Sequence, residues 1–168
     1  MTEASQLYRQ MEKECPAFQA RATARALTRH YNACFRPLGI TAEQFSLLVG
    51  IGGGDEPTIA ELAARAGIDA TTLSRSVKSL EQKNLILNRG GRGRAGKRLA
   101  LTAAGQALMA DAVTIWACAR AKLADALSEQ MLREASLLMS QIATAANHRP
   151  LVLDADRLKC QPRQSRHS

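Results

Sequence analysis

Aromatic rings and long apolar runs are scarce in this chain of 168 residues, which has three Phe, two Tyr and one Trp. No apolar run approaches the roughly 18 residues that a membrane-spanning helix needs. The first 16 residues are polar and mixed in charge, without the apolar stretch of a secretory signal peptide. We therefore expect a cytoplasmic protein that does not span a membrane.

Clustered metal ligands and catalytic groups are also lacking. No two cysteines have the C-x-x-C spacing of a zinc site, and the histidines are far apart. There is no nucleophile–base pair, so the sequence predicts no enzyme, no metal and no cofactor. The segment 91–97 matches G-x-x-x-x-G-K, but Arg98 follows where a phosphate-binding loop has Ser or Thr, and no helix begins there.

The residues that are abundant favour helix and a basic surface. Ala and Leu supply much of an apolar fraction of 46%. The chain has 23 basic and 15 acidic side chains, a formal charge of +8. Such a charge suits a polyanionic partner, provided that it is concentrated in one region.

Capping patterns divide the first half of the chain into helices. A polar arm at 1–14 precedes a predicted helix at 17–35, where Leu27, Tyr31 and Cys34 repeat at helical spacing. Thr41 and Thr58 each begin a capping box, the first opening a helix that ends at a glycine-rich loop.

A helix-turn-helix follows from 58 to 83. The helix at 58–66 ends at Gly67, and Asp69 is a suitable N-cap for the helix at 70–83. Leu73, Val77 and Leu80 form the predicted buried stripe of that second helix, which leaves small, polar and basic side chains outside. This is the layout of a motif whose second helix enters the major groove.

Two short apolar stretches at 85–87 and 99–101 flank a Gly- and Arg-rich segment, which predicts a β-hairpin with a basic tip. The sequence thus predicts a mainly α fold with a small β-hairpin wing: a winged helix-turn-helix with long N- and C-terminal dimerisation helices.

Helices predicted at 103–127 and 129–147 carry more apolar surface than one small domain can cover, which favours a homodimer. The predicted domains are an N-terminal arm and dimerisation helix (1–40), a DNA-binding domain (41–102), C-terminal dimerisation helices (103–148) and a basic tail (149–168).

The positive charge coincides with the predicted winged helix. Nine basic and three acidic side chains lie between Thr58 and Thr102, and the tail after Pro150 adds four basic and two acidic ones. This concentration is typical of nucleic-acid binding. A helical interaction module without DNA is the alternative, and the basic hairpin argues against it.

Several segments in this order resemble the MarR family of bacterial transcription regulators. They are RPLGITAEQF at 36–45, TIAELAARAG at 58–67, TTLSR at 71–75, LEQKNLI at 80–86 and LTAAG at 101–105. The resemblance spans roughly residues 15–147. It implies an obligate homodimer that binds double-stranded DNA at a pseudo-palindromic operator and releases it on binding a small phenolic or carboxylic ligand.

The chain departs from the family at the wing. Gly93 and Ala95 stand where the family usually has an Asp and an Arg. Arg92 and Arg94 remain as the wing residues predicted to contact DNA, on a loop without the bracing acid. The major-groove set is predicted on the second helix of the motif: Thr71, Thr72, Ser74, Arg75 and Lys78.

Two further hypotheses concern regulation. Arg21, Tyr31, Phe45 and Trp116 are the predicted lining of the family's ligand cleft. A peroxide-sensing branch of the family carries a reactive cysteine near the start of its first helix, and Cys15 lies about two residues before that place. Tyr31 matches a tyrosine of that branch, whereas Arg21 replaces another. Redox switching through Cys15 is therefore the alternative to ligand control.

Overall fold

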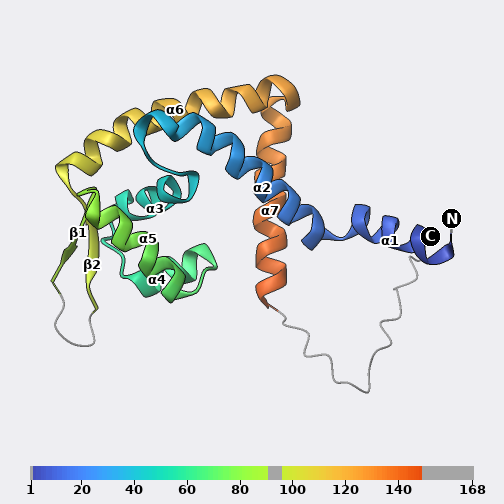
Figure 1. The fold of residues 1–168 in the computed structure, drawn as a ribbon, viewed down its shortest axis with the longest axis horizontal. Coiled ribbons are helices and arrows are strands. Elements are labelled where there is room, and N and C mark those ends of the chain that lie inside the picture. Colours follow the sequence, from blue (N-terminus) through green and yellow to red (C-terminus); the bar gives the residue numbers. More distant parts are fainter. Residues whose placement is uncertain (1, 91–95, 149–168) are drawn as a thin grey trace, which may run out of the picture. The chain divides into compact units, whose positions relative to one another are not determined.

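The computed structural model describes residues 2–90 and 96–148 (Figure 1). The fold is mainly helical with one antiparallel hairpin, as predicted. In chain order its elements are α1 (Glu3–Glu14), α2 (Pro16–Phe35), the short 3₁₀ helix η1 (Arg36–Leu38), α3 (Ala42–Gly52), α4 (Ile59–Ala66), α5 (Ala70–Gln82), β1 (Ile86–Arg89), β2 (Arg98–Leu101), α6 (Ala103–Leu127) and α7 (Glu129–His148).

The chain divides into two compact units, at residues 1–122 and 123–168. The first holds every element from α1 to most of α6. The second holds the end of α6 and α7, and Ser128 caps the start of α7 because the Met131 amide donates to Ser128 Oγ at 3.3 Å.

Both predicted capping boxes are present and set where α3 and α4 begin. The Gln44 amide donates to Thr41 Oγ1 at 3.1 Å, and the Thr41 amide donates to the Gln44 side chain at 3.1 Å. Thr58 and Glu61 form the same reciprocal pair at 3.2 and 2.8 Å. Each box satisfies amides that a helix start leaves free, so these boundaries follow from local sequence.

The core of the first unit joins α2, α3, α5 and the hairpin. Phe35, Leu48, Leu73, Leu80 and Leu99 are among its fully buried side chains. The predicted stripe of α5 is confirmed, since Leu73, Val77 and Leu80 are all buried. Burial of this face is what turns the opposite face of α5 to the outside.

The hairpin is fastened to the loop before α4. β1 and β2 pair antiparallel, with Ile86 opposite Leu101 and Arg89 opposite Arg98. Beyond this pairing, Arg98 forms a bridge with Thr58, and the Leu99 amide donates to the Pro57 carbonyl at 2.9 Å. The base of the wing is thereby tied to the start of the helix-turn-helix.

The start of α6 approaches the backbone just before β1. The Thr102 amide donates to the Leu85 carbonyl at 3.1 Å, and Thr102 Oγ1 donates to the Asn84 carbonyl at 2.6 Å. At Gly105 an added Cβ would collide with the Leu85 carbonyl oxygen. Glycine is therefore required here by space.

The N-terminal arm is more ordered than the sequence predicted. Residues 3–14 form a helix of 12 residues, where the sequence predicted a polar arm. The prediction was wrong because it relied on the polar composition of this segment. Leu7 and Met11 lie four residues apart, a spacing that places them on one face of a helix. None of the residues of α1 is buried.

The second unit presents an uncovered apolar helix. On α7, Met131, Leu137, Leu138, Met139 and Ile142 are between 46% and 61% exposed. Within residues 2–90 and 96–148, no helix is long and apolar enough to cross a membrane.

Candidate nucleic-acid interface

A sharp turn joins α4 to α5. Gly67 adopts a left-handed conformation (φ 63°) at the end of α4, and the Ile68 amide donates to the Ala63 carbonyl at 3.1 Å. Glycine tolerates this conformation and allows the chain to reverse in three residues. The predicted helix-turn-helix is therefore present.

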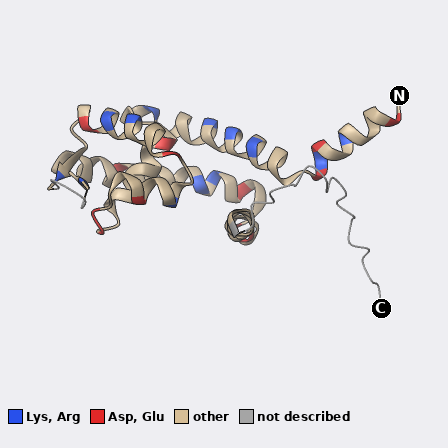
Figure 2. Cartoon of the chain, turned by 90° about the horizontal axis from the view of Figure 1, so that it is seen from below, with Lys and Arg blue, Asp and Glu red and all other residues tan. Residues whose placement is uncertain are grey.

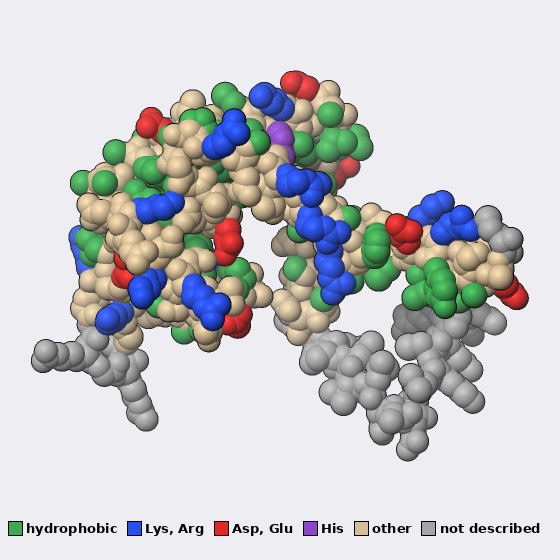
Figure 3. Space-filling view, in the orientation of Figure 1, with side chains coloured by type: hydrophobic (Ala, Val, Ile, Leu, Met, Phe, Trp, Pro, Cys, Tyr) green, Lys and Arg blue, Asp and Glu red, His purple; other side chains and the backbone are tan. Residues whose placement is uncertain are grey.

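The outer face of α5 carries the predicted major-groove residues. Thr71, Thr72, Ser74, Arg75 and Lys78 are all exposed. In the part of the chain that the structure describes, Arg75 and Lys78 have no hydrogen bond or ion pair, so their charges are available to a ligand. Basic side chains gather over the face formed by α4, α5 and the hairpin (Figure 3).

Thr72 has a structural task that the sequence interpretation did not assign. Its amide donates to Asp69 Oδ1 at 2.8 Å, and its hydroxyl donates to Asp69 Oδ2 at 2.5 Å. Both hydrogen bonds lower the pKa of the Asp69 carboxyl, and the one from the Thr72 hydroxyl has the larger effect. Thr72 therefore stabilises the start of α5, whereas the hydroxyls of Thr71 and Ser74 have no such partner among the described residues.

Side-chain hydrogen bonds fix α5 against α3. Ser76 donates to Glu43 Oε1 at 3.1 Å, and Gln44 donates to Ser79 Oγ at 3.2 Å. Lys83 closes the end of α5 by donating to the Gly39 carbonyl at 2.7 Å. The helix that presents Arg75 and Lys78 is thus held on a fixed support.

The predicted wing residues Arg92 and Arg94 lie outside the described residues. The structure does place the hairpin base, where Arg89, Lys97 and Arg98 are exposed. The sequence interpretation counted these three cations in the net charge but did not assign them to the site. Their positions at the ends of the two predicted strands could have identified them.

Glu56 organises two of these cations. Its carboxylate pairs with the Arg89 guanidinium at 2.9 Å, and its backbone oxygen accepts from Arg98 at 3.0 Å. Glu56 has a positive φ of 42°, which turns the loop toward the hairpin. Glu56 thereby braces the base of the wing, although it does not occupy the family's usual acid position at Gly93.

Two of the four predicted cleft residues, Tyr31 and Phe45, stack on the ring of the same residue, Phe35. The Tyr31 and Phe35 rings stack with centroids 6.1 Å apart, and Phe35 and Phe45 stack at 4.5 Å. Burial raises the pKa of the Tyr31 phenol, an effect that the positive charge of Arg120 opposes. Arg120 was not predicted from the sequence.

The other two cleft residues are placed differently. Arg21 is exposed and precedes Tyr31 by ten residues, about 15 Å along α2, so one chain does not bring them together. Trp116 is 39% exposed on α6. His30 Nε2 contacts the Ala119 carbonyl on α6 at 3.0 Å and ties α2 to α6 beside Tyr31.

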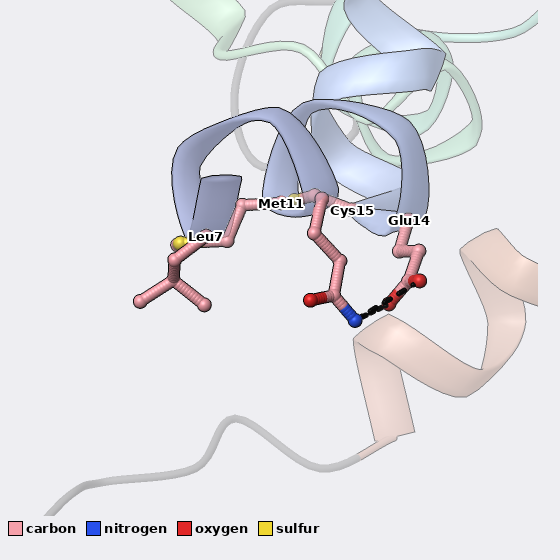
Figure 4. Close-up of a pocket in the computed structure, with 5 residues that line it drawn as sticks. Leu7, Met11, Glu14 and Cys15 are labelled. Carbon is pink, nitrogen blue, oxygen red and sulfur yellow. Dashed lines mark hydrogen bonds between the residues drawn. The ribbon is translucent and has the colours of Figure 1, made fainter. Parts of the chain in front are cut away.

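Cys15 is the single residue between α1 and α2 and the N-cap of α2. It is half-buried at the edge of a shallow hollow that Leu7, Met11 and Glu14 also line (Figure 4). Cys34 and Cys118 are also free thiols. The described residues contain no group of His, Cys, Asp or Glu that could hold a metal ion.

A capped helix-turn-helix with a basic outer helix, followed by a hairpin fastened to its base, defines a winged-helix protein. A model described as MarR family matches residues 38–95. The M. tuberculosis transcriptional regulator MosR is 33% identical, with 80% of this chain and 98% of that chain covered and a TM-score of 0.67. The chain belongs to the MarR family of winged-helix transcriptional regulators.

More distant solved structures share the fold. A putative MarR family regulator from Listeria monocytogenes, complexed with 26mer DNA, is 24% identical over 77% of this chain and 87% of that chain, with a TM-score of 0.67. A Mycobacterium tuberculosis MarR family protein in complex with salicylic acid is 22% identical over 76% and 95%, with a TM-score of 0.59. No curated protein sequence matches the chain.

Proposed function

We propose that this chain is a homodimeric, sequence-specific DNA-binding repressor, without catalytic activity of its own, that acts on DNA in the cytoplasm. The observation that carries the proposal is the outer face of α5, where Arg75 and Lys78 are exposed on a helix fixed by Asp69 and α3. MosR, the 33% identical relative, has also been solved in complex with DNA.

The proposed binding mode assigns different tasks to helix and hairpin. α5 lies in the major groove, where Arg75 reads a guanine bidentately and Lys78 contacts phosphate. Arg92 and Arg94 at the wing reach the minor groove, and Lys97 and Arg98 contribute positive charge at its base. Two copies present their α5 helices about 34 Å apart, to match successive major grooves.

Release of DNA follows from a population shift. A small phenolic or carboxylic ligand stabilises a dimer whose half-site spacing no longer matches the operator. Tyr31, Phe45 and Trp116 are the proposed contacts, with Arg21 supplied by the second copy. The salicylic acid complex of the distant relative supports a ligand of this chemical class.

The test measures binding to labelled DNA from the gene's own promoter region by fluorescence anisotropy. We expect Arg75→Ala to cost about 1–3 kcal/mol of the free energy of binding and to relax the sequence preference at one base pair. Lys78→Ala should weaken binding to all duplexes equally and lower the salt dependence of the affinity. Lys122→Ala, at an exposed cation of α6, is the matched control. If both variants bind like the control, α5 is not the recognition helix.

A second proposal is redox control through Cys15, favoured by its position as the half-buried break between two helices. The Cys15 thiolate attacks an organic hydroperoxide and breaks its O–O bond, which gives the sulfenic acid and releases the alcohol. The polar sulfenic acid changes packing at the junction of α1 and α2.

Peroxide treatment of the DNA complex distinguishes the two proposals. Under redox control, hydroperoxide abolishes binding by the wild type and by Cys118→Ser, which keeps Cys15, but not by Cys15→Ser. Binding that is indifferent to peroxide in all three proteins contradicts redox control and leaves ligand control in place.

A further inference from the structure

The outer face of α2 carries a row of positive charge. Arg25, Arg29 and Arg36 are exposed, and Arg36 is the residue at which α2 ends. At 100° per residue these three positions fall within about 40° of one another, whereas Leu27 and Cys34, on the opposite side, are half-buried. Figure 2 shows basic and no acidic positions along α2, and Figure 3 shows basic side chains in a line on its surface. We call Arg25, Arg29 and Arg36 the arginine row.

The arginine row has no counter-charge of its own. No acidic residue occurs between residues 15 and 42. Among the residues that the structure describes, none of the three guanidinium groups makes a hydrogen bond or an ion pair. Arg21 is not counted in the row because it lines a hollow together with Glu12. Like charges four residues apart on a helix repel each other, so an anionic partner would stabilise this face.

The surroundings of the arginine row favour a duplex nucleic acid over a protein. Protein interfaces depend on large apolar or aromatic anchors, and residues 19–48 expose no large hydrophobic side chain. Single strands are held by stacking on exposed aromatic rings, which the same stretch lacks. Guanidinium groups bind phosphate bidentately, and surfaces that bind DNA are more polar and more positive than those that bind proteins. The row therefore suits the phosphate backbone of a duplex.

The chain after the arginine row reaches the end of α5 that lies furthest from the predicted base contacts. A recognition helix contacts bases through its N-terminal residues, here the turn that ends at Arg75. Lys83, after the last turn of α5, donates to the Gly39 carbonyl at 2.7 Å, three residues after Arg36. Arg75 and Lys83 are about 12 Å apart along the helix.

α3 lies between α2 and α5 (Figure 1). The Ala42 amide at its start donates to Asn32 Oδ1 of α2 at 2.7 Å, and Gln44 in the same turn donates to Ser79 of α5 at 3.2 Å. The width of a helix, about 10 Å, thus separates the arginine row from α5. The row is open to a DNA segment other than the one that α5 reads.

We propose that the arginine row binds the phosphate backbone of a second DNA duplex, so that a dimer seated on its operator bridges two DNA segments. This rests on the DNA-binding dimer of the proposed function. Arg25 to Arg36 spans about 17 Å, the axial length of about five base pairs, so the three guanidinium groups meet separate phosphates. Contacts to phosphate alone make this binding independent of sequence and sensitive to salt.

Capture of a second duplex by operator-bound protein tests the bridging. Full-length protein is loaded below saturation onto operator DNA fixed to beads, so that its operator holds every dimer, and a labelled duplex without the operator is added. The row variant replaces all three arginines: Arg25→Gln, Arg29→Gln and Arg36→Gln. The matched control removes three exposed cations of α1 and α6: Arg9→Gln, Lys13→Gln and Lys122→Gln.

We expect the wild type and the control to retain the labelled duplex, and the row variant to retain it about tenfold less or weaker still. Capture that is absent in the wild type, or equal in the row variant and the control, overturns the proposal. A row variant that no longer dimerises in sedimentation also overturns it, because the row is then a contact between subunits.

Two further measurements complete the test. If the row variant loses affinity only for operator DNA with long flanks, the row lies on the operator duplex itself and the proposal fails. Should circular dichroism show that the row variant is unfolded, the single change Arg29→Gln replaces it. The logarithm of the wild-type capture constant falls linearly with the logarithm of the salt concentration, and Arg29→Gln should reduce this slope by about 0.9. An unchanged slope overturns the proposal.

Fluorescence anisotropy on a short operator duplex separates this inference from the proposed function. The row variant should bind this duplex like the wild type. A wild-type chain that does not bind operator DNA contradicts the proposed function itself. A wild-type chain that binds its operator and captures no second duplex contradicts only the bridging by the arginine row.

Discussion

Gly105, in the first turn of α6, lies directly against the Leu85 carbonyl. We expect Gly105→Ala to destabilise the fold by about 1–3 kcal/mol, because backbone has to shift to admit the methyl group. Urea unfolding followed by circular dichroism measures this. Gly53→Ala is the control, since Gly53 has a helical φ of −66° and open space around its Cα; equal stability of the two variants would refute the argument.

Asp69 couples the start of α5 to pH. Its pKa is lowered in the folded chain by the Thr72 hydroxyl and amide. Its contribution to stability is therefore full above its unfolded pKa of about 3.9 and is lost as the pH falls through the lower folded value. We expect the melting temperature to fall more steeply with acidification in the wild type than in Asp69→Asn, which keeps a capping oxygen without a charge.

Melting curves of the two proteins between pH 6 and about 2 make this comparison. Glu61, whose pKa is lowered chiefly by the Thr58 amide, responds in the same direction in both proteins and so cancels. Parallel curves would show that the Asp69 carboxylate contributes nothing to the pH dependence.

At the scale of elements, the wing is braced from the loop before α4 rather than from its own tip. Removing the Glu56 carboxylate by Glu56→Gln frees Arg89, whereas Arg98 keeps the Glu56 backbone oxygen. We expect stability to change by less than about 1 kcal/mol, because the ion pair is exposed. Affinity for non-operator duplex should rise, since one negative charge leaves the basic surface.

Anisotropy titrations at two salt concentrations check this prediction. Arg65→Ala, which breaks the Asp55 pair at 3.4 Å while removing a positive charge, provides the opposite control and should lower non-specific affinity. Unchanged non-specific binding by Glu56→Gln would mean that Arg89 lies away from the DNA.

Elements with local determinants could be predicted from the sequence. The capping boxes at Thr41 and Thr58, the turn at Gly67 and the buried stripe through Leu73 all depend on neighbours in the chain. The brace by Glu56 could not, because it joins residues 33 and 42 positions apart through an unusual backbone angle.

At the scale of the whole molecule, the spacing of the half-sites in the operator tests whether two copies bind DNA together. Two α5 helices held at fixed spacing require half-sites on one face of the duplex. Inserting about five base pairs between the half-sites turns one of them to the far side, so we expect affinity to fall to the non-specific level. The same insertion outside the half-sites should have no effect, and equal affinity for both DNAs would contradict simultaneous binding by two copies.

The candidate site could be predicted only in part, because some of its features follow from one helix and others from the packing of several helices. The exposed cations Arg75 and Lys78 follow from the period of one helix. The influence of Arg120 on Tyr31 depends on how α2 and α6 pack, which no single helical pattern encodes. The separation of Arg21 from Tyr31 follows instead from their spacing of ten residues within α2.

The continuity of α6 has a mechanical consequence. This helix of 25 residues begins against the wing at Leu85 and passes from the first compact unit into the second at residue 123. Its length is about 37 Å, so a tilt of about 5° displaces its far end by about 3 Å. Under the ligand control proposed above, a ligand that tilts α6 by this amount at one end moves the other end by a distance comparable to the rise of one base pair.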